Sequence, residues 1–328
     1  MAGIKAWRKI QFGKEATQGT KVDATTIWRG IGTIQDNQET VFPEEDIGIL
    51  MGVDRSYVPR VEAGLNLEST EATFEQLPYL FEMGLKSVTP TTDANGNGIF
   101  TYTFPIQSTD AVPSTDLATY SVRGGDNEAV ESFTFGYCRS FTLSGTAGQA
   151  LMMSAELVGR QVSTDSFTAA VSIPAIEEIL FSKGKLYIDP TSTFPATTQK
   201  SNTLLDMSLS ITPGWTHVYT GDGYLYFSFL KQVQPEVILT ITFEHDAISV
   251  AEKAYWKAGT ARSISLEFAG SSAAKYAKFR MVGKWDNFQQ LGERDGNDIV
   301  QGTFRCCYNA TAAGFFSAVI GTGLASLP

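Results

Sequence analysis

The chain contains few of the side chains that build catalytic or metal centres. Its 328 residues include only two histidines and three cysteines. Neither His217 nor His245 has a second His or Cys at the spacing of metal ligands, and Cys306 and Cys307 are adjacent instead of forming a C-x-x-C pair. Three cysteines also cannot form a disulfide framework, so we expect folding in a reducing compartment. These shortages argue against a zinc site and a histidine-based triad.

Positive charge and long apolar runs are also scarce. The 25 Lys and Arg are outnumbered by 35 Asp and Glu, which gives a formal charge of -10 and an isoelectric point near 4.8. Gripping nucleic acid requires clustered Lys and Arg, although an acidic surface can let DNA slide past. The first residues lack a signal-peptide core, and "FFSAVIGTGLASL" near the end is too short and glycine-rich to span a bilayer. We expect a cytosolic product without a membrane anchor.

Catalytic and ligand-binding motifs are missing as well. No Walker-type loop, nucleophile elbow or H-E-x-x-H occurs. The segment 93–100, "DANGNGIF", imitates the start of a calcium loop, but Phe104 stands where the bidentate carboxylate belongs, so a hairpin turn is favoured. Three consecutive acids in "FPEEDIG" (42–48) cannot all face one cleft, which favours a solvated or repulsive face. We expect no enzyme, no metal and no cofactor.

What the chain does contain is alternation of apolar and polar residues. Hydrophobic residues make up 43% of it, and stretches such as "LYFSFLK", "VILTITF", "SISLEF" and "KFRMVGKW" repeat at period two with many β-branched and aromatic residues. Between such stretches lie turn signals in which Gly stands beside Asn or Asp, as in "RGGDN", "TGDG" and "RDGND". The pattern predicts a mainly β fold of antiparallel strands.

Only two segments are predicted to be helical, and the first follows residue 72. Thr73 and Gln76 fit a capping box, and Gly84 is positioned to stop the helix. Pro78 fits a straight helix poorly. It either kinks the helix or marks the first turn of a helix that begins later.

The second predicted helix follows "VILTITFEH". Asp246 is its expected N-cap, and Gly259 its expected C′ residue. This places His245 at a strand-to-helix junction, which favours a structural role over a metal or acid-base site. The expected apolar stripe of this helix consists of Ile248, Ala251, Tyr255 and Ala258.

The two helices occupy equivalent contexts in the two halves of the chain. Each follows an alternating strand and precedes strand-like segments with a Gly/Asp turn, and aligning Leu65 with Leu239 gives nearly the same offset as aligning Gly84 with Gly259. We therefore expect a diverged duplication with a boundary near Ser163–Ser172. The first unit is residues 1–165, with an N-terminal arm, and the second is residues 166–328, with a C-terminal tail.

Three stretches resemble a known family. The stretches are residues 13–48, "GKEATQGTKVDATTIWRGIGTIQDNQETVFPEEDIG", residues 131–162, "ESFTFGYCRSFTLSGTAGQALMMSAELVGRQV", and residues 223–247, "GYLYFSFLKQVQPEVILTITFEHDA". They resemble major tail tube proteins of long-tailed, siphophage-like bacteriophages. That family is related to the inner-tube proteins of type VI secretion systems. The resemblance covers most of the chain in order and contains no catalytic motif.

The resemblance implies a fold and a function. Each unit is expected to be a tail-tube-type β-sandwich or barrel with one flanking helix, and units join into rings that stack into a hollow conduit for the genome. The usual ring is a hexamer, so two units in one chain suggest trimeric rings with pseudo-six-fold symmetry. A hexamer decorated by the second unit is the alternative. The implied location is the virion tail, assembled in the host cytoplasm.

The resemblance also suggests partners and contact residues. Expected partners are other copies of the chain, the tape measure protein, the tail terminator and the distal tail proteins, and DNA crosses the lumen without specific binding. The candidate lumen acids are Glu44, Glu45, Asp46, Glu156 and Glu267. The candidate inter-ring contacts lie in the N-terminal arm, the loop 190–203 and the C-terminal tail, and comprise Trp7, Phe12, Phe194, Phe315 and Phe316.

Two other readings remain open at this point. A gene-transfer agent or a tail-like bacteriocin would use a tube of nearly the same sequence. A two-domain β-sandwich that binds carbohydrate on a virion or cell surface would instead present exposed aromatic side chains on one platform.

Overall fold

A computed structural model describes residues 3–48, 50, 54–92, 100–106 and 116–327. Its elements from the N-terminus to residue 164 are η1(Lys5–Trp7), β1(Lys9–Lys14), β2(Thr26–Trp28), β3(Gly32–Val41), β4(Tyr57–Glu71), α1(Leu77–Gly84), β5(Thr91–Thr92), β6(Phe100–Ile106), β7(Tyr120–Gly125), β8(Val130–Thr146), β9(Met152–Gly159) and β10(Ser163–Thr164). The remaining elements are η3(Phe181–Lys183), β11(Gly184–Pro190), β12(Gln199–Lys200), β13(Leu204–Thr212), β14(Trp215–Val218), β15(Phe229–Gln232), β16(Glu236–Glu244), α2(Ala247–Lys257), β17(Arg262–Ala269), β18(Tyr276–Phe288), β19(Gly292–Arg294), β20(Asn297–Cys306) and β21(Phe316–Thr322).

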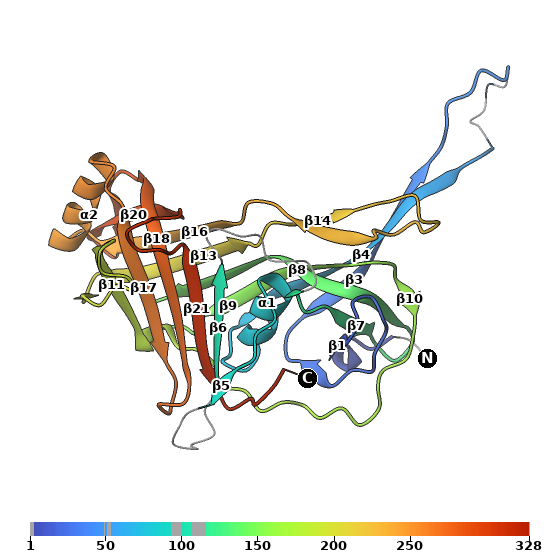
Figure 1. Cartoon of the computed structure of the whole chain (residues 1–328), viewed down its shortest axis with the longest axis horizontal. Helices are drawn as coiled ribbons and strands as arrows, with labels where there is room; N and C mark the ends of the chain where they lie inside the picture. The colour runs from blue at the N-terminus through green and yellow to red at the C-terminus, as the bar shows by residue number, and fades with distance from the viewer. Residues whose placement is uncertain (1–2, 49, 51–53, 93–99, 107–115, 328) are drawn as a thin grey trace.

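The fold is mainly β, as predicted. Nineteen strands form one hydrogen-bonded network, β14 and β15 form a separate hairpin, and the strand pairs run antiparallel. Two α-helices accompany the sheets (Figure 1). The strands of the described residues do not close into a barrel.

The same strand order occurs twice in the chain. In what we call the first repeat, β1 pairs with β7, β7 with β8, β8 with β9, β9 with β4, and β4 with β3. In the second repeat, β11 pairs with β17, β17 with β18, β18 with β20, β20 with β16, and β16 with β13. Each repeat also has its helix after the corresponding strand, β4 or β16. These two sets of strands therefore share one pairing order.

Residue-level landmarks support the correspondence. The long strand of each repeat changes partners at a glycine, Gly136 in β8 and Gly283 in β18. A Cβ would lie 2.6 Å from the carbonyl oxygen of Tyr120 at the first position and 2.1 Å from that of Arg305 at the second, so only glycine permits these strand approaches. A register shift follows the glycine in both strands.

The alignment of Leu65 with Leu239 agrees with this register. Leu65 faces Leu157 across the β4–β9 pair, and Leu239 faces Phe304 across the β16–β20 pair. All four side chains are fully buried. Equivalent positions of the two repeats therefore supply equivalent core contacts.

The two repeats are joined through their sheets. β8 of the first repeat pairs with β13 of the second over residues 141–146 and 206–211, and β6 pairs with β21. A single apolar cluster extends across both repeats, with Phe81 of α1 stacking on Phe279 of β18 at 6.1 Å between ring centroids. The repeats consequently share a core.

Helix α1 begins at Leu77, with Pro78 in its first turn. The Thr73 hydroxyl accepts the Gln76 N–H at 3.2 Å one turn earlier. Pro78 therefore marks the first turn of a helix that begins later, and it does not kink a helix that begins at Thr73. Gly84 is the last helical residue, and the cap is Leu85 instead. A Cβ on Gly84 would crowd the side chain of Pro213 at 3.2 Å, which explains the glycine by packing and not by helix termination.

Helix α2 starts and ends where local signals place it. The Asp246 carboxylate accepts the N–H groups of Ile248 and Ser249, each at 2.9 Å, and Gly259 has φ of 64° just beyond the C-cap. The expected apolar stripe was wrong, because Ser249 and Glu252 are the buried residues of this helix. Of the expected stripe, Ile248 is half-buried and the others are exposed: Ala251, Tyr255 and Ala258.

A buried glutamate fixes each helix to its repeat. Glu82 of α1 is fully buried and accepts hydrogen bonds from Lys14 Nζ at 2.6 Å, Tyr120 Oη at 2.7 Å and Ser87 Oγ at 2.8 Å. The pKa of Tyr120 is raised well above its ordinary value, first because the phenol is buried and then because Glu82 is charged beside it. The carboxylate therefore receives its hydrogen bonds from a phenol that stays protonated.

Glu252 of α2 has the corresponding position in the second repeat. It accepts hydrogen bonds from Arg262 Nη2 at 2.8 Å and from Trp285 Nε1 at 3.0 Å. Tyr120 lies opposite Gly136, and Arg262 lies opposite Gly283, so both glutamates bind the same position of their repeats. The geometry is shared although the donors differ.

Replacing Glu82 by Ala should destabilise the chain strongly. The substitution leaves Tyr120 Oη buried without its acceptor and removes the partner of Lys14, which should cost about 3 kcal/mol of unfolding free energy. Denaturant titration followed by tryptophan fluorescence measures the loss. Glu68→Ala, at an exposed position of β4, should stay within about 0.5 kcal/mol of the unmodified chain. Equal losses in the two variants would contradict a structural role for the buried carboxylate.

Candidate assembly surfaces

One edge of the sheet ends in β3. This ten-residue strand pairs with β4, and within the described chain no strand pairs with its other side. Residues 35–40 are exposed, and the strand carries an unpaired row of backbone donors and acceptors. A long exposed edge of this kind is a site for adding another strand.

The opposite edge is formed by the end of β18 together with β19. Both pair with β20, and their other side meets no strand of the described residues beyond Gly283. Leu291, between β18 and β19, is 50% exposed. Each repeat thus contributes one of these two free edges, β3 from the first and β18–β19 from the second.

The contact between β8 and β13 joins the counterparts of these two free edges within the chain. β13 corresponds to β3, because each is the outer partner of β4 or β16, and β8 corresponds to β18. Leu143 and Leu209 face each other across this pair, and both are fully buried. We call the β8–β13 contact the internal junction. It joins the edge of one repeat to the opposite edge of the other.

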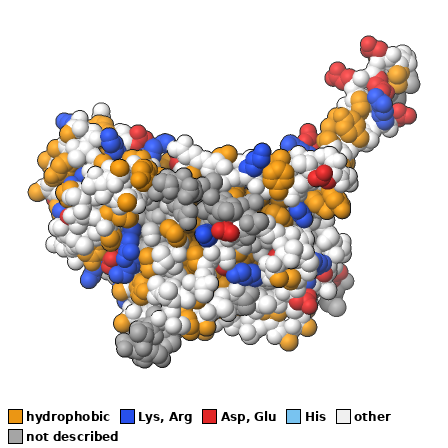
Figure 2. Space-filling model, in the orientation of Figure 1, with side chains coloured by type: hydrophobic (Ala, Val, Ile, Leu, Met, Phe, Trp, Pro, Cys, Tyr) orange, Lys and Arg blue, Asp and Glu red, His pale blue; other side chains and the backbone are white. Residues whose placement is uncertain are grey.

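Each repeat also carries an extension between the two strands of its outer hairpin. The first extension lies between β3 and β4, and its described residues 42–48, 50 and 54–56 project away from the body of the molecule (Figure 1). It exposes Phe42 at 68% and Ile47 at 50% of their surface, and orange side chains are visible along it in Figure 2. Apolar side chains held away from the core mark a contact surface.

The second extension contains the hairpin β14–β15, which lies against the first repeat. Trp215 donates from Nε1 to the carbonyl oxygen of Gly84 at 2.6 Å, and Phe227 packs edge-to-face on Phe135 with 5.2 Å between centroids. Arg160 Nη2 donates to the carbonyl oxygen of Ser228 at 2.9 Å. The second extension is therefore docked across the internal junction, whereas the first is exposed.

His217 lies in this docked hairpin. Its Nε2 is 3.1 Å from Glu62, and its Nδ1 is 3.2 Å from Tyr137 Oη. Burial lowers the pKa of His217 below its ordinary 6.5, against the opposing effect of Glu62. The ring is a packing and hydrogen-bonding residue of the hairpin, while His245 donates its backbone N–H to Asp298 at the start of α2.

The face of the sheet opposite the core is covered by small polar side chains. They alternate along the strands with buried residues such as Leu143, Leu209 and Leu239. Its half-buried hydroxyl and amide side chains are Thr142, Ser144, Ser154, Ser208, Ser210, Thr240, Gln301 and Thr303. On the same face, Glu156 is paired with Arg139 at 3.3 Å. The surface is polar and carries balanced charge.

The candidate lumen acids lie on three separate elements. Glu44, Glu45 and Asp46 belong to the projecting extension, where Glu45 pairs with Arg55. Glu156 lies in β9, and Glu267 lies in β17, where it pairs with Lys278 at 3.2 Å. The structure does not bring these acids together on one surface of the chain.

The candidate inter-ring residues divide by burial. Trp7 is 55% exposed, whereas Phe194 and Phe315 are half-buried. Phe12 and Phe316 are buried in the core, Phe12 beside Trp28 at 5.5 Å and Phe316 stacked near Phe81 at 6.5 Å between centroids. These two side chains are corrected to core residues, because strand alternation turns them inward.

The described residues offer little for a ligand or a membrane. No three His, Cys, Asp or Glu side chains among them gather as metal ligands. Neither helix of the described segments combines the length and apolar character needed to cross a bilayer. The calcium-like segment 93–99 lies outside the described residues.

Comparison with known proteins identifies one family. A family model described as phage tail tube protein matches residues 8–306. This range includes both repeats, both extensions and the internal junction. No curated protein matches the chain.

Acidification should loosen the β14–β15 hairpin. Because the pKa of His217 is lower in the folded chain, the unfolded hairpin binds more protons between that pKa and about 6.5, and stability rises with pH across this window. Amide hydrogen exchange of residues 215–218 and 229–232, corrected for intrinsic rates, should lose up to about tenfold protection per pH unit below 6.5. His217→Gln should abolish this pH dependence. Unchanged dependence in that variant would assign it to another group.

Proposed function

Since the chain belongs to the phage tail tube protein family, we propose that its copies join head to tail into closed rings that stack into a hollow conduit for the phage genome. The chain is a structural tail tube subunit and not an enzyme. One observation carries the ring proposal. The edges left free in the chain, β3 and β18–β19, are the counterparts of the two edges joined at the internal junction.

Ring closure follows from repeating that junction between copies. A contact between two different surfaces is heterologous, and it closes into a ring when the rotation per unit divides a full turn. If the junction between copies repeats the one inside the chain, six repeats form the ring and three chains supply them. Both repeats then contribute the same strands to the wall, which supports the trimeric, pseudo-six-fold ring over a hexamer decorated by a second unit.

The polar face of the sheet is our choice for the lumen wall. Hydroxyl and amide side chains give DNA phosphates few fixed cations to bind, and the charged groups there are paired, as in Glu156 with Arg139. The residual charge of the chain is negative, which repels phosphate over about 8 Å at physiological salt. Such a wall would let DNA pass without adsorbing.

The proposal includes a place in the particle. The subunit belongs to the virion tail, is assembled in the host cytoplasm and meets the tape measure protein, the tail terminator and the distal tail proteins. A tube of a gene-transfer agent or of a tail-like bacteriocin would use the same contacts, and the neighbouring genes distinguish those cases.

Purified protein should form rings or tubes with three chains per turn of the ring. Negative-stain class averages viewed down the axis should show a hollow centre with three-fold symmetry and six similar lobes. Native mass spectrometry of the ring should give three copies of the 35.6 kDa chain. Six copies would support the decorated hexamer. A monomer that binds a carbohydrate array would instead support the surface-module reading.

Phage particles carrying Glu156→Gln should eject DNA more slowly than unmodified particles. The change leaves Arg139, whose side chain is 51% exposed, without its partner on the proposed lumen wall, where it can bind phosphate in every ring. Ejection in vitro, followed by fluorescence of a DNA-binding dye, measures the rate. Arg139→Gln combined with Glu156→Gln removes both charges and should restore normal ejection. Normal ejection by the single variant would place this face outside the DNA path.

A further inference from the structure

We propose that the turn between β19 and β20 of one copy docks into a pocket of the next copy, formed between η1, β3 and β7 and bordered by Lys5 and Arg8. The inference rests on the ring assembly proposed above and specifies its contact residue by residue. It is carried by the internal junction, in which the corresponding turn and the corresponding pocket already meet within one chain.

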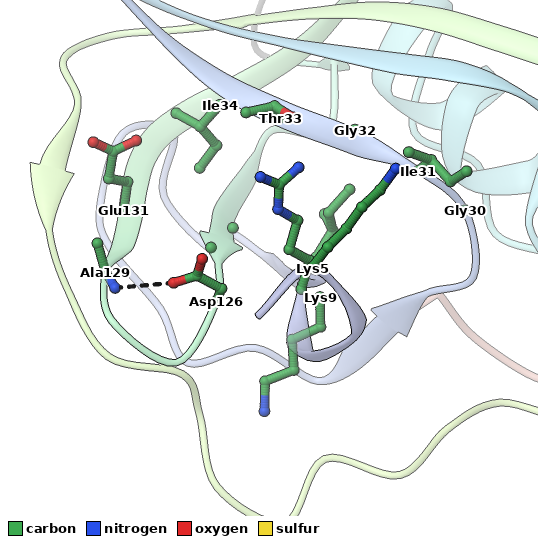
Figure 3. A pocket seen from close by; sticks show the side chains of 14 residues that line it. Lys5, Lys9, Gly30, Ile31, Gly32, Thr33, Ile34, Asp126, Ala129 and Glu131 are labelled. Carbon is green, nitrogen blue, oxygen red and sulfur yellow. Dashed lines mark hydrogen bonds between the residues drawn. The ribbon is translucent and has the colours of Figure 1, made fainter. Parts of the chain in front are cut away.

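The pocket is a cavity of about 340 Å³ beside the free edge of β3. Lys5 and Arg8 border it from the N-terminal segment, Ile31 and Ile34 from β3 and the residue before it, and Asp126 from the turn after β7 (Figure 3). In Figure 3 the Lys5 side chain extends toward Ile31, while Lys9 points away from the pocket. Ile31 is 54% exposed.

The pocket is lined by side chains of both signs, the cations Lys5, Arg8 and Lys9 and the acids Asp126 and Glu131. Among the described residues, no carboxylate lies within 4 Å of the charged nitrogens of Lys5 or Arg8. Asp126 interacts with Arg8 at longer range, and its carboxylate accepts the backbone N–H of Ala129 at 3.2 Å. An apolar floor with cations at the rim suits an acidic, partly apolar loop.

The second repeat contains the same position, already filled. η3 precedes β11 as η1 precedes β1, so Phe181 corresponds to Lys5. There, the β8–β9 turn of the first repeat is seated: Phe181 N donates to the carbonyl oxygen of Gln149 at 3.0 Å, and Leu151 N donates to that of Ile179 at 2.7 Å. The Phe181 ring lies so close to Gly145 that a Cβ there would be 2.6 Å away. A turn fits this place.

The β19–β20 turn is the counterpart of the β8–β9 turn. The first turn joins β8 to β9, and the second joins β19, which follows β18 along the same edge of β20, to β20. Each contains a glycine with positive φ, 86° at Gly148 and 81° at Gly296. Counting back from these glycines pairs Leu291 with Leu143. Leu143 is fully buried at the internal junction, whereas Leu291 is 50% exposed. Leu291 therefore has the same position in its repeat as Leu143, but no strand of the described chain covers it.

The internal junction and the proposed contact between copies differ in charge on both of their surfaces. At the internal junction, Phe181 meets the uncharged turn "TAGQ" (146–149). At the free ends, Lys5 and Arg8 would meet the turn "ERDGND" (293–298), which has three acids. Its one cation, Arg294, is already paired with Asp206 of its own chain. The cations Lys5 and Arg8 at the pocket rim complement the acids of this turn, and this charge match disfavours a wrong pairing with the apolar junction.

The internal junction also predicts the register. Leu143 faces Leu209 in the β8–β13 pair, and Ile34 corresponds to Leu209 because Ile34 faces Leu65 as Leu209 faces Leu239. Leu291 of one copy should therefore face Ile34 of the next. Both types of antiparallel pair hold Cα atoms about 4.5 to 5.5 Å apart, which suits a disulfide.

Cysteine pairing tests the register directly. The chain with Ile34→Cys and Leu291→Cys is prepared with Cys307→Ser, because Cys307 is the one native cysteine that is not buried. Mild oxidation should give a covalent ladder that ends at a closed trimer on a non-reducing gel, whereas either single variant should stay monomeric on the gel. A mixture of the two single variants should give only dimers. Shifting one cysteine to Asp36 should reduce cross-linking about tenfold or more.

The outcomes separate this inference from the ring proposal. Rings in micrographs without cross-linking at Ile34 and Leu291, or with stronger cross-linking at Asp36, overturn the proposed docking and leave ring assembly in place. Absence of rings from the unmodified protein, by microscopy and native mass spectrometry, overturns both. A ladder that ends at six overturns the trimer while supporting the docking register.

Charge exchange gives an independent test of the pocket. Lys5→Glu with Arg8→Glu should raise the concentration needed for assembly about tenfold or more, because acids would then face the acidic turn. Adding Asp295→Lys and Asp298→Lys should restore assembly. The four positions lie at exposed or rim sites, and unchanged thermal unfolding of the variants confirms that the fold is kept. Failure of the second pair of changes to restore assembly would overturn the proposed contact.

Discussion

Backbone hydrogen bonding at the edges of the sheet is the constraint on which the rest of this structure depends. A strand satisfies its N–H and C=O groups on both sides only if it has two neighbours. Inside the chain the constraint is met at the internal junction, where β13 covers the edge of β8. At β3 and at β18–β19 no strand of the described chain meets it. A chain with two different free edges suits the head-to-tail assembly proposed above.

The duplication keeps geometry and changes chemistry. Both repeats place a buried glutamate on a helix and direct donors toward it, but Glu82 binds a tyrosine and a lysine, whereas Glu252 binds an arginine and a tryptophan. The carboxylate fixes the helix to the corresponding strand of its repeat, β7 for Glu82 and β17 for Glu252, and several donor types can supply the hydrogen bonds. The same freedom extends to the pocket, where Phe181 in one repeat corresponds to Lys5 in the other. Equivalent positions of the two repeats therefore hold different chemical groups.

The two extensions also have the same place in their repeats and differ in their contacts. The hairpin β14–β15 buries Trp215 and Phe227 against the first repeat and strengthens the internal junction. The extension between β3 and β4 has the same place in its repeat, yet it exposes apolar side chains (Figure 1 and Figure 2). Exposure of that kind is costly in an isolated chain and is removed by burial against a neighbour. In the proposed assembly, a neighbouring copy would cover this exposed extension.

What the sequence determined alone lies within short range along the chain. The Asp246 cap acts on Ser249, three residues away, the glycine at 259 accepts a left-handed conformation, and alternation specifies the strands. Contacts between separate elements were decided only by the tertiary structure. α2 buries Ser249 and Glu252 in place of its apolar stripe because Arg262 of β17 and Trp285 of β18 bind Glu252. Phe12 and Phe316 enter the core, and the pocket at Lys5 exists only beside β3, because sheet register sets which side of a strand faces inward.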